Sequence, residues 1–458
     1  MTWARRQNPV GRWILSLQYK VITVPTIYLN KLEKGLMKVN SGFVIALGLL
    51  SVIGISHANN QTDIVNPKPV AQNERQHVVL MSLDGFRHDY IEKHNAVNLA
   101  RIASEGVRAK NMLSVYPAST FPNHISIITG LLPVHHGIVN NAFYDKKRPK
   151  GDTYARYSMG KGGADSTWIQ GMPLWNLVEF SGFKSATYFW PESDALINGA
   201  TPSYYYHYSK YSDYQARIDQ IIQWLSLPEG QRPLFVAGYF SLVDSMGHKF
   251  GPDAQETHAA VQTVDTLIGQ LYDRLQALPV PVNLVIVSDH GMTKIEEKRL
   301  FNVDTLDIDD DAFVVEVASS QTMIYAKPGV KNSDIDKLRQ SLQRLSQGRY
   351  HVLTDAEREE RYMPANSRTG DILLEISPPA SFTTTDGHRS VGRHGYLPSH
   401  PDMGALFVAA GPAFKKDVTL PVMQNLAIYP GLAKIMGLKL LTDVDGNTRV
   451  FEKGLKTP

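Results

Sequence analysis

Three short apolar runs, each followed within a few residues by an aspartate, constrain the fold of this chain more than any other feature. The runs and their acids are 77–83 with Asp84, 234–240 with Asp244, and 282–288 with Asp289. A largely apolar run of this length is typical of a strand that is buried on both faces, as in parallel sheets. Between the last two runs, apolar residues recur at helical spacing from Val261 to Leu275. This β-α-β order predicts an α/β fold with a doubly wound, mostly parallel sheet.

The three acids are expected to lie at one edge of this sheet. Ligands of open α/β sheets bind at the carboxyl ends of the strands. Residues about 301–385 depart from the pattern, with predicted antiparallel strands at 313–317 and 323–325 and a helix near 333–346. We therefore predict a small α+β insertion in the main domain.

Composition excludes several kinds of site. The chain has no cysteine, which rules out disulfides, thiolate nucleophiles, cysteine-bound zinc and iron–sulfur clusters. Residues 1–58 hold seven of the 47 basic residues but only one of the 44 acidic ones, so the remainder carries a slight acidic excess. Such a surface does not favour nucleic acid as a bulk polyanionic partner.

The first 75 residues divide into three predicted segments. Residues 37–58 combine a basic start, a 14-residue apolar run and small residues at Ser56 and Ala58, the pattern of a cleaved signal peptide. The run is short for a membrane span, so no stable span is expected after cleavage, although an uncleaved anchor is the alternative. Residues 1–36 form an upstream extension that this pattern does not explain, and 59–75 is a polar linker. We predict a periplasmic or secreted protein whose catalytic domain occupies 76–458.

Six side chains form a candidate metal-binding set: Asp84, Asp244, Asp289, His248, His290 and His394. Each short motif is weak alone, because an Asp-His pair can be an ordinary surface pair or a helix cap. Together, six nitrogen and oxygen ligands suit two zinc ions that keep open coordination positions. Two-metal sites of this kind act on both the attacking and the leaving oxygen of a displacement at phosphorus.

Thr120 is the candidate nucleophile for such a displacement. Pro122 predicts a helix that begins close to it. Backbone amides and the helix dipole would then favour an alkoxide on Thr120. Asn123 is expected to donate to the phosphoryl oxygens. The alternative is that Thr120 only caps the helix and Asn123 is only exposed.

Taken in order, these segments resemble the nucleotide pyrophosphatase/phosphodiesterase family of the alkaline phosphatase superfamily. The similarity runs from about residue 76 to about 415, through the following blocks: 83–90, 120–124, 129–130, 136–138, 189–194, 244–252, 289–292 and 394–396.

The resemblance implies an alkaline phosphatase-like fold and zinc-dependent hydrolysis of phosphodiester or pyrophosphate bonds of nucleotides or their derivatives. It implies one zinc on Asp84, Thr120, Asp289 and His290, and a second on Asp244, His248 and His394. Thr120 would form a covalent phosphothreonine intermediate, and Asn123 would stabilise the transition state. A base would lie between Phe121 and a tyrosine, Tyr208 or Tyr205, with Trp190 also at the substrate.

Two other readings remain open at this point. Within the superfamily, the chain could be a phosphonoacetate hydrolase or a phosphomonoesterase, although no paired arginine near Thr120 supports a monoester dianion. A sulfatase is disfavoured because its nucleophile motif is missing. From another class, the chain could be a non-catalytic periplasmic protein that binds metal or nucleotide.

Overall fold

The computed structural model describes residues 75–387 and 389–456. The predicted upstream extension and signal peptide lie outside these residues, as does all of the predicted linker except Arg75. Among the described residues, no helix is both long and apolar enough to cross a membrane.

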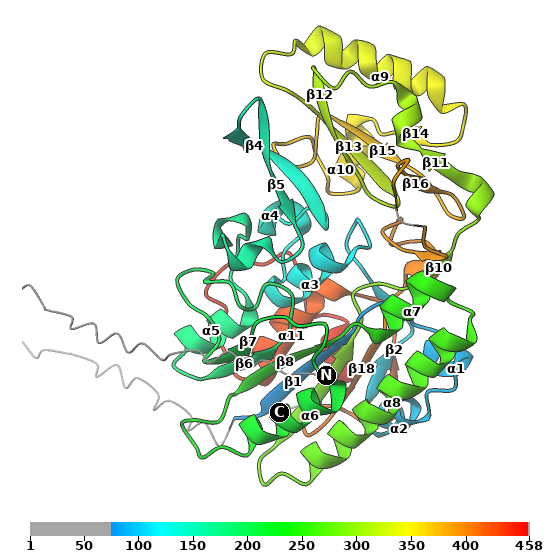
Figure 1. The fold of residues 1–458 in the computed structure, drawn as a ribbon. Helices are drawn as coiled ribbons and strands as arrows, with labels where there is room; N and C mark the ends of the chain where they lie inside the picture. Colours follow the sequence, from blue (N-terminus) through cyan, green and yellow to red (C-terminus); the bar gives the residue numbers. More distant parts are fainter. Residues whose placement is uncertain (1–74, 388, 457–458) are drawn as a thin grey trace, which may run out of the picture. The chain divides into compact units, whose positions relative to one another are not determined.

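An eight-stranded sheet forms the centre of the domain (Figure 1). Its strands, in spatial order, are β19 (Val418–Leu420), β2 (Val107–Ala109), β18 (Phe407–Ala410), β9 (Val282–Val287), β1 (His77–Leu83), β8 (Phe235–Phe240), β6 (Ser185–Tyr188) and β7 (Tyr204–Tyr206). Only β18 among them runs antiparallel to its neighbours. The three acid-bearing runs are the adjacent parallel strands β9, β1 and β8, every residue of which is buried. The predicted mostly parallel sheet is therefore confirmed.

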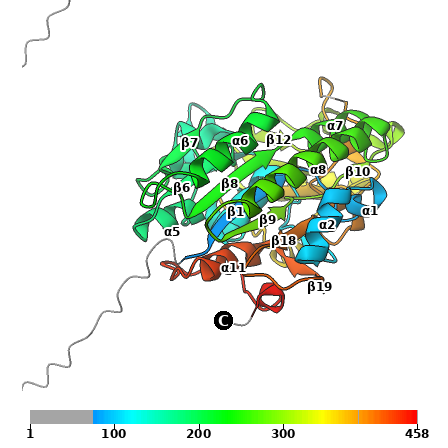
Figure 2. The ribbon, with the colours of Figure 1, turned by 90° about the horizontal axis from the view of Figure 1, so that it is seen from below.

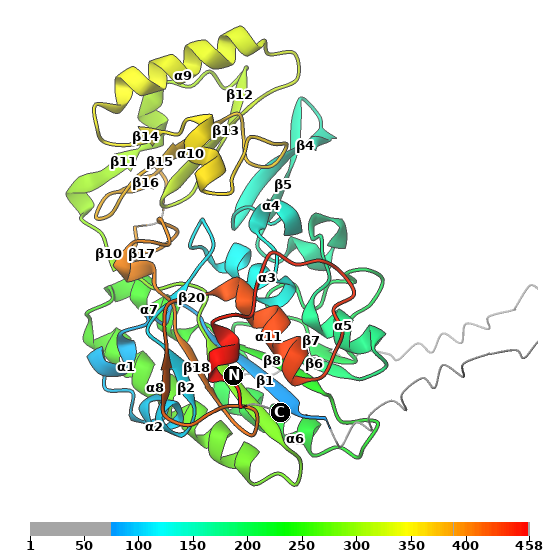
Figure 3. The same ribbon diagram turned by 180° about the vertical axis from the view of Figure 1, so that it is seen from behind.

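Helices cover both faces of this sheet. One face packs against α2 (Val97–Glu105), α6 (Tyr214–Leu225) and α8 (Gln255–Gln276), and the other against α3 (Thr120–Thr129), α5 (Leu174–Phe180) and α11 (Ile428–Ile435). Figure 2 shows α6 and α8 on one side and α11 on the other, and Figure 3 shows α3 and α11 in front of the sheet. Alternate residues of β1 enter the two cores, Leu80 on the side of α3 and Met81 on the side of α8. The doubly wound arrangement follows from this two-faced burial.

A separate α+β unit interrupts the main fold after β9. Its antiparallel sheet has the order β12 (Phe313–Val317), β13 (Gln321–Ala326), β15 (Ile372–Glu375), β14 (His351–Val352), and it carries α9 (Asn332–Ser346) and α10 (Asp355–Glu360). A small core of its own holds it together, including Ile324, Leu342 and Leu374. The predicted α+β insertion is thus present, and it returns to the main domain through β16 (Ser381–Thr383) and β17 (Gly392–Arg393), which pair with β11 (Leu300–Asn302) and β10 (Thr293–Lys294).

The remaining elements connect these layers. They are α1 (Tyr90–Lys93), α4 (Pro133–His136), α7 (Leu242–Phe250), the hairpin of β4 (Ala142–Lys150) and β5 (Thr153–Ser158), and the pair β3 (Met112–Leu113) and β20 (Met423–Gln424).

Candidate metal centre and active site

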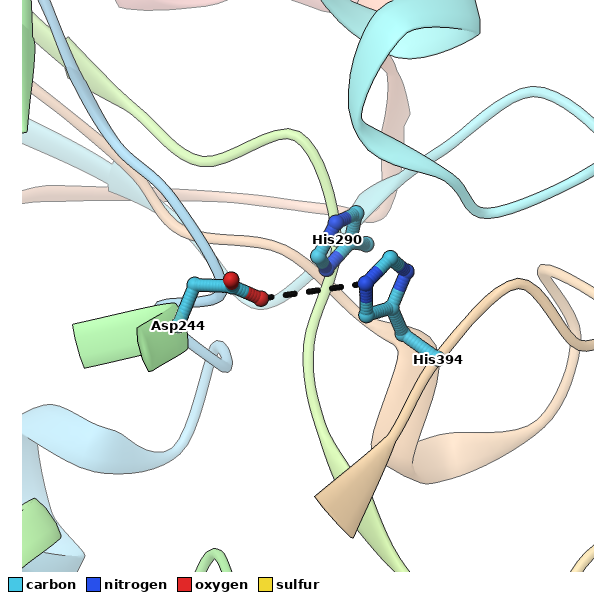
Figure 4. A group of neighbouring side chains, drawn as sticks. All are labelled: Asp244, His290 and His394. Atoms are coloured by element: carbon cyan, nitrogen blue, oxygen red, sulfur yellow. Dashed lines mark ion pairs between the residues drawn. The ribbon is translucent and has the colours of Figure 1, made fainter. Parts of the chain in front are cut away.

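The three predicted acids meet at the carboxyl edge of the central sheet. Asp84 follows β1 directly, Asp289 lies just beyond β9, and Asp244 lies in the first turn of α7 after β8. Two groups of side chains each place one ligand atom apiece within 4.8 Å of one another: Asp84, Asp289 and His290, and Asp244, His290 and His394. Figure 4 shows the second group, with the carboxylate of Asp244 directed at the ring of His394. These groups could each hold a metal ion.

The three histidine rings have the orientation of metal ligands. In each ring Nδ1 lies against a backbone carbonyl: His290 against Gly291 at 2.9 Å, His248 against Gly392 at 2.8 Å, and His394 against Ala118 at 3.1 Å. A nitrogen that faces a carbonyl carries the proton, so the neutral ring presents the lone pair of Nε2 to the cluster. Metal-bound histidines are held by this kind of hydrogen bond.

Several acceptor atoms in the cluster face one another without a proton donor between them. Among the described residues, Asp84 Oδ1, Asp244 Oδ1 and Asp289 Oδ2 are buried and accept no hydrogen bond. The Nε2 atoms of His248 and His394 lie 3.1 Å apart, and that of His290 lies 3.0 Å from Asp289 Oδ2. Buried charges are stable only when they are paired or bound to metal. A cation between these atoms satisfies them all, so the side chains fit a metal centre made of nitrogen and oxygen ligands.

The electrostatics of the cluster agree with this fit. Burial raises the pKa of Asp84 well above its ordinary value, and the carboxylates of Asp289 and Asp244 raise it further. Burial also opposes ionisation of Asp289, but without a bound cation positive charge on His290 and His124 outweighs burial and lowers the pKa of that carboxyl. A metal ion would take the place of this charge and leave the histidine rings neutral. Burial, and then His290, lower the pKa of His394 well below its ordinary value. A dication beside Asp84 would favour the ionised form of its carboxyl, because the positive charge offsets burial and the neighbouring carboxylates.

Thr120 lies beside this cluster. It is the first residue of α3, is 8% exposed, and its Oγ1 is 3.2 Å from Nε2 of His290. Two buried side chains that the sequence analysis left out support the same region. Tyr239 donates its hydroxyl proton to Asp84 Oδ2 at 2.5 Å, and Nδ1 of His124 lies 2.8 Å from the carbonyl oxygen of Thr120.

The prediction that Asn123 contacts the phosphoryl group is wrong. Its side chain is fully buried, and its amide nitrogen donates to the carbonyls of Pro117 at 2.9 Å and Ser119 at 2.8 Å. Its amide oxygen accepts from the N–H of Val115 at 2.7 Å. The loop before α3 folds back over Asn123 and occupies its polar atoms. Asn123 therefore stabilises this loop and has no donor left for a substrate.

Asn141 lies beside the first turn of α3. Its Oδ1 accepts a hydrogen bond from the N–H of Phe121 at 2.8 Å, although the two residues are 20 apart in sequence. Among the described residues, no hydrogen bond is found for its amide nitrogen, and its side chain lines the cleft beside the metal centre. In the sequence, this contact is marked only by the Asn140-Asn141 pair shortly after His136-Gly137, and that pair gives no indication that Asn141 lies near Thr120.

The predicted substrate aromatics have different environments. Trp190 is 1% exposed and donates its Nε1 proton to the carbonyl of His124 at 3.3 Å, so direct contact with a substrate is contradicted. Phe121 is partly buried, and Tyr205 is half-buried on β7. Tyr208 is 56% exposed, and its ring centroid lies 6.5 Å from that of Tyr239. A role for Phe121, Tyr205 and Tyr208 in binding a base stays a prediction.

A cleft of about 380 Å³ opens beside the metal centre. The catalytic side contributes Ser119, Asn141, His248 and His394 to its walls, and the α+β unit contributes residues of the β12–β13 connection. Through this cleft a substrate would reach His248 and His394.

Comparison with known proteins agrees with this geometry. Residues 78–397 match the type I phosphodiesterase/nucleotide pyrophosphatase family. A venom phosphodiesterase of Macrovipera lebetinus is 32% identical over 383 residues, covering 80% of this chain and 44% of the relative. Human ectonucleotide pyrophosphatase/phosphodiesterase family member 1 is 30% identical over 396 residues, covering 82% and 41%. The chain thus spans less than half the length of these curated relatives.

A solved structure is similar over its whole length. Murine ectonucleotide pyrophosphatase/phosphodiesterase 5, in an inactive threonine-to-alanine variant in complex with AMP, superposes with a TM-score of 0.76 at 26% identity. The match covers 83% of this chain and 100% of the murine chain. The predicted alkaline phosphatase-like fold is confirmed by this likeness. On the extent of the family match, the chain belongs to the type I phosphodiesterase/nucleotide pyrophosphatase family.

Proposed function

We propose that this chain hydrolyses phosphodiester or pyrophosphate bonds of nucleotides or nucleotide derivatives through a covalent phosphothreonine at Thr120, with two zinc ions as cofactors. The observation that carries the proposal is the position of Thr120 Oγ1, 3.2 Å from His290 Nε2 at the edge of the unsatisfied carboxylate cluster. Names of relatives support the substrate class: venom phosphodiesterases, nucleotide pyrophosphatases, and a structure with AMP.

The side chains divide into two ligand sets in this proposal. Asp84, Asp289 and His290, with Thr120, would hold one ion, and Asp244, His248 and His394 would hold the other. Bound zinc would lower the pKa of the Thr120 hydroxyl and neutralise negative charge at the phosphoryl group.

Thr120 Oγ1 would then attack phosphorus. The new Oγ1–P bond forms as the bond from phosphorus to the leaving oxygen breaks, and the leaving group departs with that electron pair. The hydroxyl proton of Thr120 would pass to solvent before the attack. Water would subsequently attack phosphorus, so that its oxygen stays on the phosphoryl group, the Oγ1–P bond breaks and a proton returns to Oγ1. Since the N–H of Phe121 holds the amide oxygen of Asn141, the NH₂ group of Asn141 is the available donor to a phosphoryl oxygen.

We predict that Asn141→Ala lowers kcat for a nucleotide diester by about 10²–10³-fold, the range for loss of one preorganised donor. Steady-state kinetics with the metal-loaded protein measures this. Asn123→Ala is the matched comparison. It should lower the melting temperature, because buried carbonyls lose their donor, and the soluble folded fraction should keep kcat within about tenfold. Equal kcat for Asn141→Ala and wild type would contradict the assignment.

Phe121→Ala tests whether a base stacks on this ring. We expect kcat/KM for nitrophenyl thymidine monophosphate to fall by about 10–100-fold, since stacking on an aromatic ring contributes about 1–3 kcal/mol. For bis(nitrophenyl) phosphate, which has no base, the fall should be under about threefold. Tyr211→Ala, which removes a tyrosine that is 86% exposed, is the matched control. Equal losses on both substrates would indicate a packing role for Phe121 instead.

Export is also part of the proposal. The basic start, apolar run and small residues at 37–58 support a signal peptide and a periplasmic or secreted location.

A further inference from the structure

The connection between β12 and β13 reaches the metal centre through two consecutive serines of the α+β unit. Ser320 Oγ donates to the carbonyl of Gly395 at 2.5 Å, and Ser319 Oγ accepts from the guanidinium of Arg393 at 2.9 Å. Gly395 and Arg393 are the two sequence neighbours of His394. The insertion therefore contacts both sequence neighbours of a metal-ligand candidate, the backbone of Gly395 and the side chain of Arg393.

The next residue, Gln321, contacts the other half of the site. Its Oε1 accepts from the amide nitrogen of Asn140 at 2.9 Å, and both side chains are almost completely buried. Asn140 Oδ1 accepts from the N–H of Asn141 at 2.8 Å. Asn141 Oδ1 in turn accepts from the N–H of Phe121, the second residue of α3. An unbroken chain of hydrogen bonds therefore runs from the insertion to the helix that carries Thr120.

Residues 319–321 are themselves firmly held. The carbonyl of Ser319 accepts two hydrogen bonds at 2.8 Å, from the N–H of Phe382 and from the hydroxyl of Ser381. Gln321 pairs across the sheet with Glu375, whose carboxylate accepts from Tyr116 at 2.7 Å. Residues 319–321 are thus fixed by hydrogen bonds within the α+β unit, and the residues that they contact in the main domain meet a well-held segment.

The approach of this segment to α3 depends on one glycine. Gly395 has φ +93°, and a Cβ at this position would lie 2.8 Å from Ser320 Oγ and 3.0 Å from Ser119 Oγ. A side chain at this position would displace these two serine hydroxyls, and the positive φ itself favours glycine. The serine hydroxyls of the insertion and of the residue before α3 therefore both lie close to Gly395, the residue after His394.

We propose that residues 319–321 of the α+β unit are a positioning element for the reaction, and that Gln321 is a positioning residue that acts through Asn141. This inference rests on the proposed function. A transition-state donor must be held within about 0.5 Å of its productive position, and a displacement of about 1 Å can cost about 10²-fold in rate. The hydrogen bonds from Gln321 through Asn140 supply this restraint to Asn141, which by itself is only partly buried.

The test is a double-mutant cycle on the metal-loaded full chain with a nucleotide diester as substrate. Gln321→Leu should lower kcat by about tenfold or more and leave KM within about twofold, because it misplaces a donor that acts in the transition state. The same change in an Asn141→Ala background should have less than about a twofold effect, since the group through which Gln321 acts is absent.

Two further variants separate positioning from stability. Thr322→Val alters the next residue of β13, which is equally buried and whose hydroxyl has no hydrogen-bond partner among the described residues, and it should leave kcat unchanged. Asn140→Ala cuts the same chain of hydrogen bonds from the main domain and should reproduce the loss if Gln321→Leu does not fold.

The outcomes distinguish this inference from the proposed function. Wild-type kcat for Gln321→Leu or Asn140→Ala would overturn the inference alone, as would equal losses with and without Asn141. Absence of diester hydrolysis by the zinc-loaded wild type would overturn the proposed function and this inference with it.

Discussion

Replacing Thr120 with alanine should reduce diester hydrolysis by at least about 10⁴-fold while the protein keeps its fold and its metal. Loss of a nucleophile removes the covalent route, and the remaining electrostatic groups support only a small residual rate. The Thr120 side chain has one hydrogen-bond contact among the described residues, with Nε2 of His290, so its removal costs little stability. Turnover, metal content by elemental analysis, and melting temperature are to be measured on the same preparation.

Thr129→Ala is the matched control for this variant. Thr129 ends α3, and its hydroxyl donates to the carbonyl of Ile125 at 2.6 Å. The Thr129→Ala variant removes the same side-chain atoms from the other end of the same helix, away from the cluster, so kcat should be unchanged. A second measurement tests the covalent step: after an acid quench, label from a nucleotide substrate should be recovered on the peptide that contains Thr120. Turnover within about tenfold of wild type in Thr120→Ala would contradict the phosphothreonine mechanism.

Removing the divalent cations should abolish activity and lower the free energy of unfolding. Three carboxylates and three imidazole nitrogens converge, and one oxygen of each carboxylate accepts no hydrogen bond among the described residues, so the metal-free fold retains buried acceptors that nothing satisfies. An ion present at about 1,000 times its Kd stabilises the folded state by about 4 kcal/mol. Dialysis against a chelator should therefore lower the melting temperature and leave less than about 1% of the turnover; two equivalents of Zn²⁺ should restore both.

Two aspartate variants, one in the cluster and one outside it, test where the metal is bound. Asp289→Asn should reduce the bound metal by about one ion per chain. Asp265→Asn alters an aspartate that is also buried, whose carboxylate accepts the N–H groups of Asn98 and Leu99 at the start of α2, and it should retain both ions. Unchanged turnover and melting temperature after complete chelation would contradict a metal-dependent mechanism.

The α/β core could be predicted because its signal is local. Residues 77–83 are apolar except His77 and Ser82, a pattern typical of a strand covered on both faces, and β1 is indeed buried throughout and lies between β8 and β9. Parallel neighbours end at the same edge, so Asp84, Asp244 and Asp289 had to meet once the strands paired. The metal-ligand candidates followed from that topology together with the family motifs.

The polar groups around Thr120 could not be predicted in this way. Asn123 shares the first turn of α3 with Thr120, which made it the natural candidate, but the preceding loop accepts from its amide nitrogen, and its amide oxygen accepts from Val115 and from the distant Asn425. Trp190 was expected at the substrate, yet packing against His124 buries it. Proximity in sequence limits which groups a side chain can reach. Whether its hydrogen-bond donors are free depends on every chain segment that packs around it.

The sequence alone was enough to predict the sheet, the family and a set of six candidate nitrogen and oxygen ligands, because strand burial and short motifs are recorded in neighbouring residues. Tertiary structure alone decided that Asn141 faces the cleft, and that residues 319–321 of the insertion hold both Asn140 and the backbone around His394. These contacts join segments far apart in the chain. Their geometry depends on how two separately packed cores meet, and no periodicity or spacing within either segment records it.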